Sequence, residues 1–161
     1  MARKIMTVLA LAGMASLPIA AAVLAQDTAG DNTMTAEEFV APATPEEAVE
    51  QRQALMRDNG ATLRSAGAAT GTEAIAAMEH LYNNFDHIPD LFPEGSIVGD
   101  SKALPVIWEN WEAFVAIADR GATAAMDGRA AAEAGDAAAY AAAVQTIGGA
   151  CGECHQQFRQ N

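Results

Sequence analysis

Two cysteines and a histidine in this chain have the residue types and the spacing needed to attach a cofactor covalently. They lie in the run Cys151-Gly152-Glu153-Cys154-His155. On a helix, residues three and four apart are neighbours on one face. Two such thiols suit thioether bonds to the vinyl carbons of a haem, and the adjacent imidazole suits the iron. The motif therefore predicts one covalent haem c, attached through Cys151 and Cys154, with His155 as an axial iron ligand.

Three other kinds of cysteine site fit the sequence less well. Two cysteines three apart within a helix have poor geometry for a disulfide. A thioredoxin-like pair belongs at a helix N-terminus after a strand, whereas this pair lies far along a helix with no strand pattern before it. A zinc site needs about four ligands, and His80 and His87 are the only other histidines. We expect both of these to be surface or helix-capping residues.

The composition indicates a helical protein with little side-chain volume for a core. The chain has 161 residues, 51% of them hydrophobic, and 39 alanines make up almost half of that hydrophobic share. Alanine favours helices but fills little space. We therefore expect one helical domain whose interior is completed by something other than side chains. The net charge of −12 argues against a nucleic-acid partner and favours cationic ones.

The first 25 residues have the three parts of a secretory signal peptide. Arg3 and Lys4 precede an apolar run, and small residues follow it up to Ala25. We predict cleavage near Ala25 and export to the periplasm; the alternative is a retained membrane anchor, since the apolar run is nearly long enough to span a bilayer. Cleavage leaves 7 basic and 21 acidic residues. Residues 26–43 are expected to form a flexible lead before a domain at residues 44–161.

Start signals and spacing predict four helices in this domain. Thr44-Pro45-Glu46-Glu47 is a capping box that begins a helix reaching about Ala66. We expect a second helix at 71–85, a loop at 86–100 that packs across the bundle, and a third helix from about 105 to 133. The last helix carries a core-facing seam of Tyr140, Val144, Ile147, Cys151, Cys154 and Phe158. The predicted fold is all-α, an antiparallel four-helix bundle with one covalently bound haem.

Several motifs resemble the class II c-type cytochromes, the cytochrome c′ family. The pattern Cys-x-x-Cys-His-x-x-Phe-Arg at residues 151–159 is specific, while residues 45–49, 104–108 and 134–136 are weaker matches. The similarity covers about residues 44–159. This family is itself a standard example of the up-and-down four-helix bundle. The resemblance implies a periplasmic monohaem electron carrier that meets redox partner proteins, and its members are often homodimers through their first two helices.

The resemblance leaves the sixth iron ligand open. It places Met56 over the distal face of the haem, where a low-spin branch of the family uses a methionine ligand and carries electrons. In cytochrome c′ proper, an apolar residue at this position covers a five-coordinate iron that binds NO or CO. The residues around Met56 resemble the low-spin branch, whereas Arg52 is more like the five-coordinate branch. We predict Met56 as the sixth ligand. The alternatives are a gas-binding protein and, for Met56 itself, a flexible core filler.

The same resemblance suggests further residues around the haem. Arg52 and Arg159 are expected near the propionates or the proximal face, and Gln53 along the distal face. The alternatives are surface salt bridges for the arginines and an exposed side chain for Gln53. No nucleophile–base pair or Gly-rich phosphate loop is evident, so we predict an electron-transfer protein and not an enzyme. Glu153 is expected to point outward, and the aromatic residues expected in the core are Tyr82, Phe85, Trp108 and Trp111.

Overall fold

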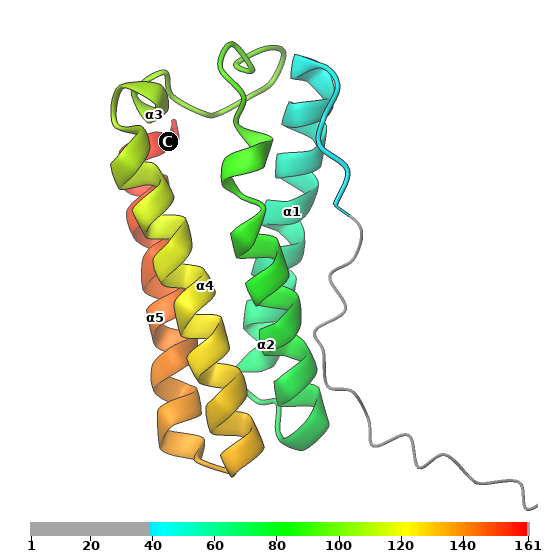
Figure 1. Cartoon of the computed structure of the whole chain (residues 1–161), viewed down its shortest axis with the longest axis vertical. Helices are drawn as coiled ribbons and strands as arrows, with labels where there is room; N and C mark the ends of the chain where they lie inside the picture. The colour runs from blue at the N-terminus through cyan, green and yellow to red at the C-terminus, as the bar shows by residue number, and fades with distance from the viewer. Residues whose placement is uncertain (1–38, 161) are drawn as a thin grey trace, which may run out of the picture. The chain divides into compact units, whose positions relative to one another are not determined.

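Four long helices dominate the computed structural model, which describes residues 39–160 (Figure 1). They are α1 (Pro45–Ala66), α2 (Gly71–Asp86), α4 (Trp111–Ala134) and α5 (Ala137–Phe158), with a short 3₁₀ helix η1 (Pro89–Leu91) and a single turn α3 (Val106–Glu109) between α2 and α4. The most extensive contacts join α2 to α4 and α4 to α5, while α1 contacts mainly α2. The predicted all-α four-helix bundle is confirmed.

The predicted signal peptide, residues 1–25, lies outside the described residues, as does most of the predicted lead. At the described end of that lead, the ring of Phe39 stacks on the ring of His87 with centroids 4.1 Å apart. Between residues 39 and 160, no helix has the length and apolarity required to cross a membrane.

Capping residues explain where the long helices begin and end. Thr44 Oγ1 accepts a hydrogen bond from the Glu47 backbone N–H at 3.1 Å, as the capping box predicts. Gly135 ends α4 in the left-handed conformation with φ 69°, which favours glycine. The Asp136 carboxylate then accepts hydrogen bonds from the first backbone N–H groups of α5. His87 is the C-cap residue of α2, which confirms its predicted capping role.

The prediction of one continuous third helix is wrong, because the segment is divided into two helices at Asn110. This residue leaves the helical conformation, with φ −125° and ψ 42°, and separates the single turn α3 from α4. Its backbone N–H and its side-chain amide both donate to the Val106 carbonyl, at 3.0 and 3.2 Å. An asparagine side chain competes in this way with the helical hydrogen-bond ladder. Hydrophobic spacing does not reveal such a break, because the apolar period continues on both sides of it.

The break also changes the expected aromatic core. Phe85 is buried as predicted, and Tyr82 and Trp108 are partly buried. The prediction for Trp111 is wrong: its side chain is 36% exposed, at the first position of α4. The Trp108 indole N–H donates to the Phe92 carbonyl at 3.0 Å. The predicted packing of the loop across the bundle is confirmed, with Ile88, Leu91 and Phe92 all buried.

Glycines allow α2 and α4 to approach each other closely. Phe85 and Met78 of α2 are buried against Gly121 and Gly128 of α4. A Cβ atom at Gly121 would overlap the Phe85 ring, and one at Gly128 would lie 2.7 Å from Met78 Sδ. The small residues of this chain therefore serve tight helix packing between α2 and α4.

Replacing Gly121 by alanine is expected to destabilise the protein. The new methyl group forces the Phe85 ring from its site, and overpacking of this kind costs about 1–3 kcal/mol. Urea unfolding of the haem-loaded protein, followed by circular dichroism, measures the free energy of unfolding. The matched control is Gly149→Ala, because a Cβ atom there has no neighbour within 4 Å; it should leave stability unchanged or raise it. Equal stability of Gly121→Ala and wild type would contradict the close packing.

Candidate haem-binding site

A pocket of about 390 Å³ opens between α1, the loop after α2 and the end of α5. This volume lies in the range of small-molecule and cofactor sites. α1 contributes Met56 and Gln53 to its wall, and α5 contributes Cys154, His155 and Phe158. Phe92, Ala103, Ile107 and Phe114 add apolar side chains to the wall, which suits the pocket to a large apolar group.

The Cys-x-x-Cys-His motif lies near the end of α5, where its side chains are half-buried. A narrower cavity of about 20 Å³ adjoins the main pocket and shares Met56, Cys154 and His155 with it, while Cys151 lines the narrower cavity. The structure therefore brings Met56 of α1 to the same space as the three motif residues, although almost a hundred residues separate them along the chain.

Burial makes the two thiols weaker acids than usual. It raises the pKa of the Cys151 thiol. It also raises the pKa of Cys154 to about 11, with the negative charges of Cys151 and Glu153 adding to the effect. A thioredoxin-like pair has a lowered thiol pKa instead, so these surroundings argue against disulfide-exchange chemistry. Within residues 39–160, no three His, Cys, Asp or Glu side chains gather as a metal site, so the structure offers no cluster for zinc.

The imidazole of His155 is suited to bind a metal. Burial lowers its pKa, and the positive charge of Arg159 adds to this effect. Both favour the neutral ring, which is the form that coordinates a metal. Glu153, between the cysteines, is exposed as predicted and forms an ion pair with Arg120 of α4.

Arg52 lies in the pocket wall, but its guanidinium holds the loop after α2. The side chain is only 4% exposed. It donates to Ser96 Oγ at 2.9 Å, to the Ser96 carbonyl at 2.6 Å, to Ser101 Oγ at 2.7 Å and to the Leu91 carbonyl at 3.3 Å. The guanidinium also lies 4.8 Å from the centroid of the Phe92 ring. The alternative of a surface salt bridge for Arg52 is therefore wrong.

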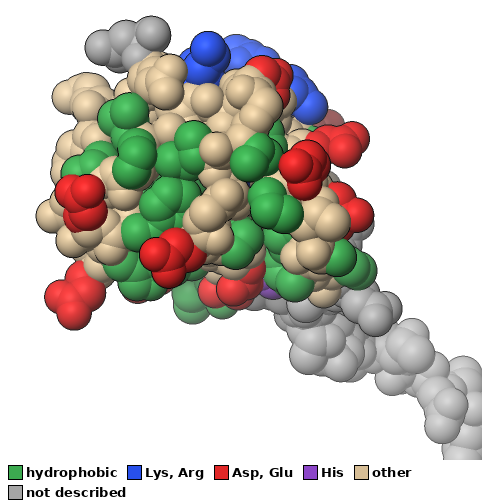
Figure 2. Space-filling view, turned by 90° about the horizontal axis from the view of Figure 1, so that it is seen from above, with side chains coloured by type: hydrophobic (Ala, Val, Ile, Leu, Met, Phe, Trp, Pro, Cys, Tyr) green, Lys and Arg blue, Asp and Glu red, His purple; other side chains and the backbone are tan. Residues whose placement is uncertain are grey.

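Basic side chains gather around this pocket in an otherwise acidic chain. Arg52, Arg57, Lys102 and Arg159 all line it, which is four of the nine basic residues in the sequence. Seen from this end of the bundle, Lys and Arg side chains collect at one edge (Figure 2). Sequence reasoning singled out Arg52 and Arg159 but missed Arg57 and Lys102. Lys102 lies in an aperiodic segment, so no sequence signal places it near the motif.

Gln53 lines the same pocket, and its side-chain amide donates to the Asp100 carboxylate at 3.2 Å. His80 contributes nothing to the pocket wall. Its ring is hydrogen-bonded to the Asp58 carboxylate in a partly exposed position, in agreement with its expected surface role.

One buried amide in the cavity wall lacks a partner. Asn59 is 4% exposed and lines the narrower cavity. Its Oδ1 accepts a hydrogen bond from Asn84 at 2.8 Å, but its Nδ2 has no partner. A buried donor without a partner costs about 1–3 kcal/mol, so this amide is available to an ordered water or a bound group. The apolar walls, the thiols, the imidazole and the basic rim of the adjoining pocket fit a haem.

Comparison with known proteins identifies the family. Residues 47–159 match the sequence profile described as Cytochrome C′. The chain belongs to the cytochrome c′ family. Cytochrome c-556 of Agrobacterium tumefaciens (strain II Chrys) is 38% identical over 119 residues, which cover 69% of this chain and 95% of that protein. Cytochrome c-556 of Rhodopseudomonas palustris is 37% identical over 145 residues, covering 81% of this chain and 93% of the relative.

Solved structures of this family share the fold. Cytochrome c′ from Thermochromatium tepidum aligns with a TM-score of 0.67 and 28% identity, covering 73% of this chain and 98% of the other. The nitric oxide complex of a cytochrome c prime variant from Alcaligenes xylosoxidans aligns with a TM-score of 0.66 and 26% identity. The alignment covers 74% of this chain and 99% of the other.

Family membership confirms several predictions. Cytochromes c′ are non-enzymatic haem proteins with one haem c attached through a C-terminal Cys-x-x-Cys. They are typically periplasmic. This chain is thus a haem protein of the electron-transport type and carries one covalent haem c.

Changing Arg52 to lysine is expected to destabilise the loop that forms one pocket wall. Lysine keeps the charge but cannot reproduce the planar set of donors that reaches Ser96 and Ser101. Loss of charge-assisted hydrogen bonds, with acceptors left buried, should cost about 2 kcal/mol or more. Urea unfolding of the haem-loaded protein measures this cost. Arg64→Lys, at an exposed position of the same helix, is the control and should change stability by less than about 0.5 kcal/mol. Similar values for the two variants would show that Arg52 does not support the loop.

Proposed function

We propose that this protein carries single electrons in the periplasm, with Cys151 and Cys154 holding the haem and His155 serving as an axial iron ligand. The observation that carries the proposal is the arrangement of these three side chains on one face of α5, at cavities that also contain Met56. When bound, the haem supplies an iron that changes between the ferric and ferrous states by one electron. The apolar walls of the pocket limit the access of water to that iron.

The basic rim positions the carboxylate end of the cofactor. Arg57, Lys102 and Arg159 provide positive charge for the haem propionates, since charge-assisted hydrogen bonds to carboxylates are strong. Arg52 adds its positive charge from within the wall, but its guanidinium N–H groups donate hydrogen bonds to the loop and not to the cofactor. Gln53 lies along the distal wall, where its link to Asp100 joins α1 to the loop.

Met56 is the sixth iron ligand in this proposal. Two observations support it: the side chain is partly buried and borders both cavities beside His155, and relatives named cytochrome c-556 and c-554 are 37–44% identical. Histidine and methionine ligation raises the potential of a haem iron and closes the site to gases. Both consequences suit an electron carrier.

Export completes the proposal. Residues 1–25 act as a signal peptide that is removed near Ala25, which agrees with the typical location of the family. The two cysteines must stay reduced until the haem is attached, because an oxidising compartment would join them otherwise.

A second candidate function is binding of NO or CO at a five-coordinate iron. It is favoured by the likeness to cytochromes c′, one of which is known as a nitric oxide complex. In that case Met56 fills space beside the iron and does not bind it.

Changing Met56 to leucine separates the two candidates. If Met56 binds the iron, the wild-type ferric spectrum is low-spin and CO does not alter the ferrous form. The variant then becomes high-spin, binds CO and has a lower reduction potential, because a thioether ligand favours the ferrous state. Optical spectra and a redox titration measure these changes.

Met126→Leu is the matched control, since Met126 is 53% exposed on α4; it should leave the spectrum unchanged. A wild-type protein that is high-spin and shifts with CO would favour the gas-binding function. A low-spin spectrum that survives Met56→Leu would exclude Met56 as the ligand.

The mass of the exported protein tests the attachment itself. We expect a polypeptide beginning at Gln26 plus the mass of one haem. A double variant, Cys151→Ala with Cys154→Ala, should lose the covalent haem and its pyridine haemochrome spectrum. The exported wild-type protein without added mass, with two free thiols, would refute the proposal.

A further inference from the structure

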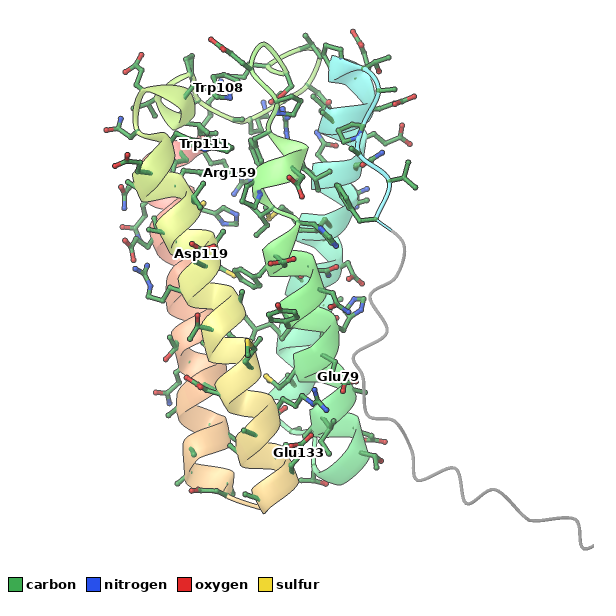
Figure 3. All side chains as sticks on the ribbon, in the orientation of Figure 1. Glu79, Trp108, Trp111, Asp119, Glu133 and Arg159 are labelled. Carbon is green, nitrogen blue, oxygen red and sulfur yellow. The ribbon has the colours of Figure 1, made fainter. Side chains whose placement is uncertain are left out.

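A surface groove lies beside the haem pocket and shares one of its walls. It has a volume of about 470 Å³, and Phe92 lines both the groove and the pocket. Trp108, Trp111, two prolines of the loop after α2, Asp90 and Glu94 form the rest of its surface. We call it the tryptophan groove. Figure 3 shows Trp108 and Trp111 at the same end of the bundle as Arg159, which lines the haem pocket.

The tryptophan groove has the chemistry of a site for a cationic side chain. It contains both tryptophans of the chain. Its only charged lining groups are the exposed carboxylates of Asp90 and Glu94. Tryptophan faces attract Lys and Arg cations, and nearby carboxylates add to the attraction. Tryptophan is also enriched at interaction surfaces. We propose that this groove docks a Lys or Arg side chain from the basic face of the protein's redox partner, an inference that rests on the proposed electron carrier.

Charge argues against two other candidates for the groove, the N-terminal segment of this chain and a second copy of the protein. The segment between Gln26 and Phe39 has four acidic residues and no basic one, so the acidic groove does not attract it. A second copy of this chain also carries a large net negative charge, which opposes self-association at an acidic surface. A basic partner protein is attracted to the acidic groove and is not repelled by it.

Rigid aromatic contacts connect the groove to the haem pocket. The Phe92 and Phe114 rings meet edge to face at 4.9 Å, and Trp111 stacks on Phe114 at 5.4 Å. Phe92 and Phe114 both line the haem pocket. Trp108 fixes the Phe92 carbonyl, and Arg52 lies over its ring. A partner seated in the groove is therefore separated from the haem pocket by little more than one layer of rings. One electron passes between the two redox centres, so one protein is oxidised and the other reduced, with no atom transferred.

Titration with a hexalysine peptide tests the docking directly. The probe is added to ¹⁵N-labelled ferrous holoprotein at low ionic strength, and the two indole N–H signals are followed. Because both tryptophans lie in the groove, both signals should shift and saturate. The combined change Asp90→Asn with Glu94→Gln should weaken this binding at least about fivefold, and 0.5 M salt should abolish it, since exposed charges are then screened. Asp127→Asn is the matched control, about 24 Å further along α4 from Trp111, and should bind as wild type does.

Three results of the titration would overturn the proposal. One is an unchanged pair of indole signals while other amide signals shift. Another is an equal response to hexaglutamate. The third is a shift on dilution of the protein alone, which would assign the groove to a second copy of the chain.

Electron-transfer rates separate this inference from the proposed function. Stopped-flow oxidation by tris(phenanthroline)cobalt(III), an aromatic cation, should slow about three- to tenfold in two variants. The carboxylate variant loses electrostatic steering, and Trp111→Ala loses the aromatic contact with the cation. Oxidation by anionic ferricyanide should not slow. Equal cobalt rates for all variants would refute the docking site and leave the carrier intact. A wild-type protein that binds hexalysine but is high-spin and gas-binding would instead refute the proposed carrier.

Discussion

The packing of this bundle depends on a space that its own side chains do not fill. The glycines of α4 let the large side chains of α2 pack closely against it, whereas α1 is held mainly by α2 and leaves about 390 Å³ open toward α5. A closed, empty cavity of that size would cost roughly 9 kcal/mol at about 24 cal/mol per Å³. That is comparable with the whole stability of a small domain. Water relieves part of this cost in an open pocket, but a large apolar ligand removes much more of it.

This constraint explains how the pocket combines apolar walls with a charged rim. A haem is apolar over most of its surface and carries two carboxylates at one edge. The chain provides rings and aliphatic groups in the wall and places four of its nine basic residues around the opening. A net negative charge on the protein does not by itself explain why its basic side chains lie together at one site. Their concentration around one pocket is best explained by an anionic edge of the ligand.

The sequence predicted the parts of this site that local patterns determine. The capping box at Thr44, the stop at Gly135 and the seam of α5 each depend on residues a few positions apart, and they place the motif correctly. The role of Arg52 could not be predicted in the same way, because its partners lie 39 to 49 residues away in a loop without periodicity. The break at Asn110 escaped prediction for a different reason: one side-chain amide ends a helix whose apolar spacing continues. Trp111, which the sequence pattern had assigned to the core, follows that break, is exposed and lines the tryptophan groove.

The loop after α2 links the two surfaces through a single set of contacts. Arg52 binds the loop at Leu91, Ser96 and Ser101. Phe92 lies between the first two of these attachments along the chain, and its carbonyl is held from the other side by Trp108. Its ring therefore lines both the haem pocket and the tryptophan groove. Loss of the hydrogen bonds from Arg52 to this loop would alter both cofactor packing and partner docking. Neutralising Asp90 and Glu94 would alter docking alone. Arg52 thus holds the loop segment that the haem pocket and the tryptophan groove share.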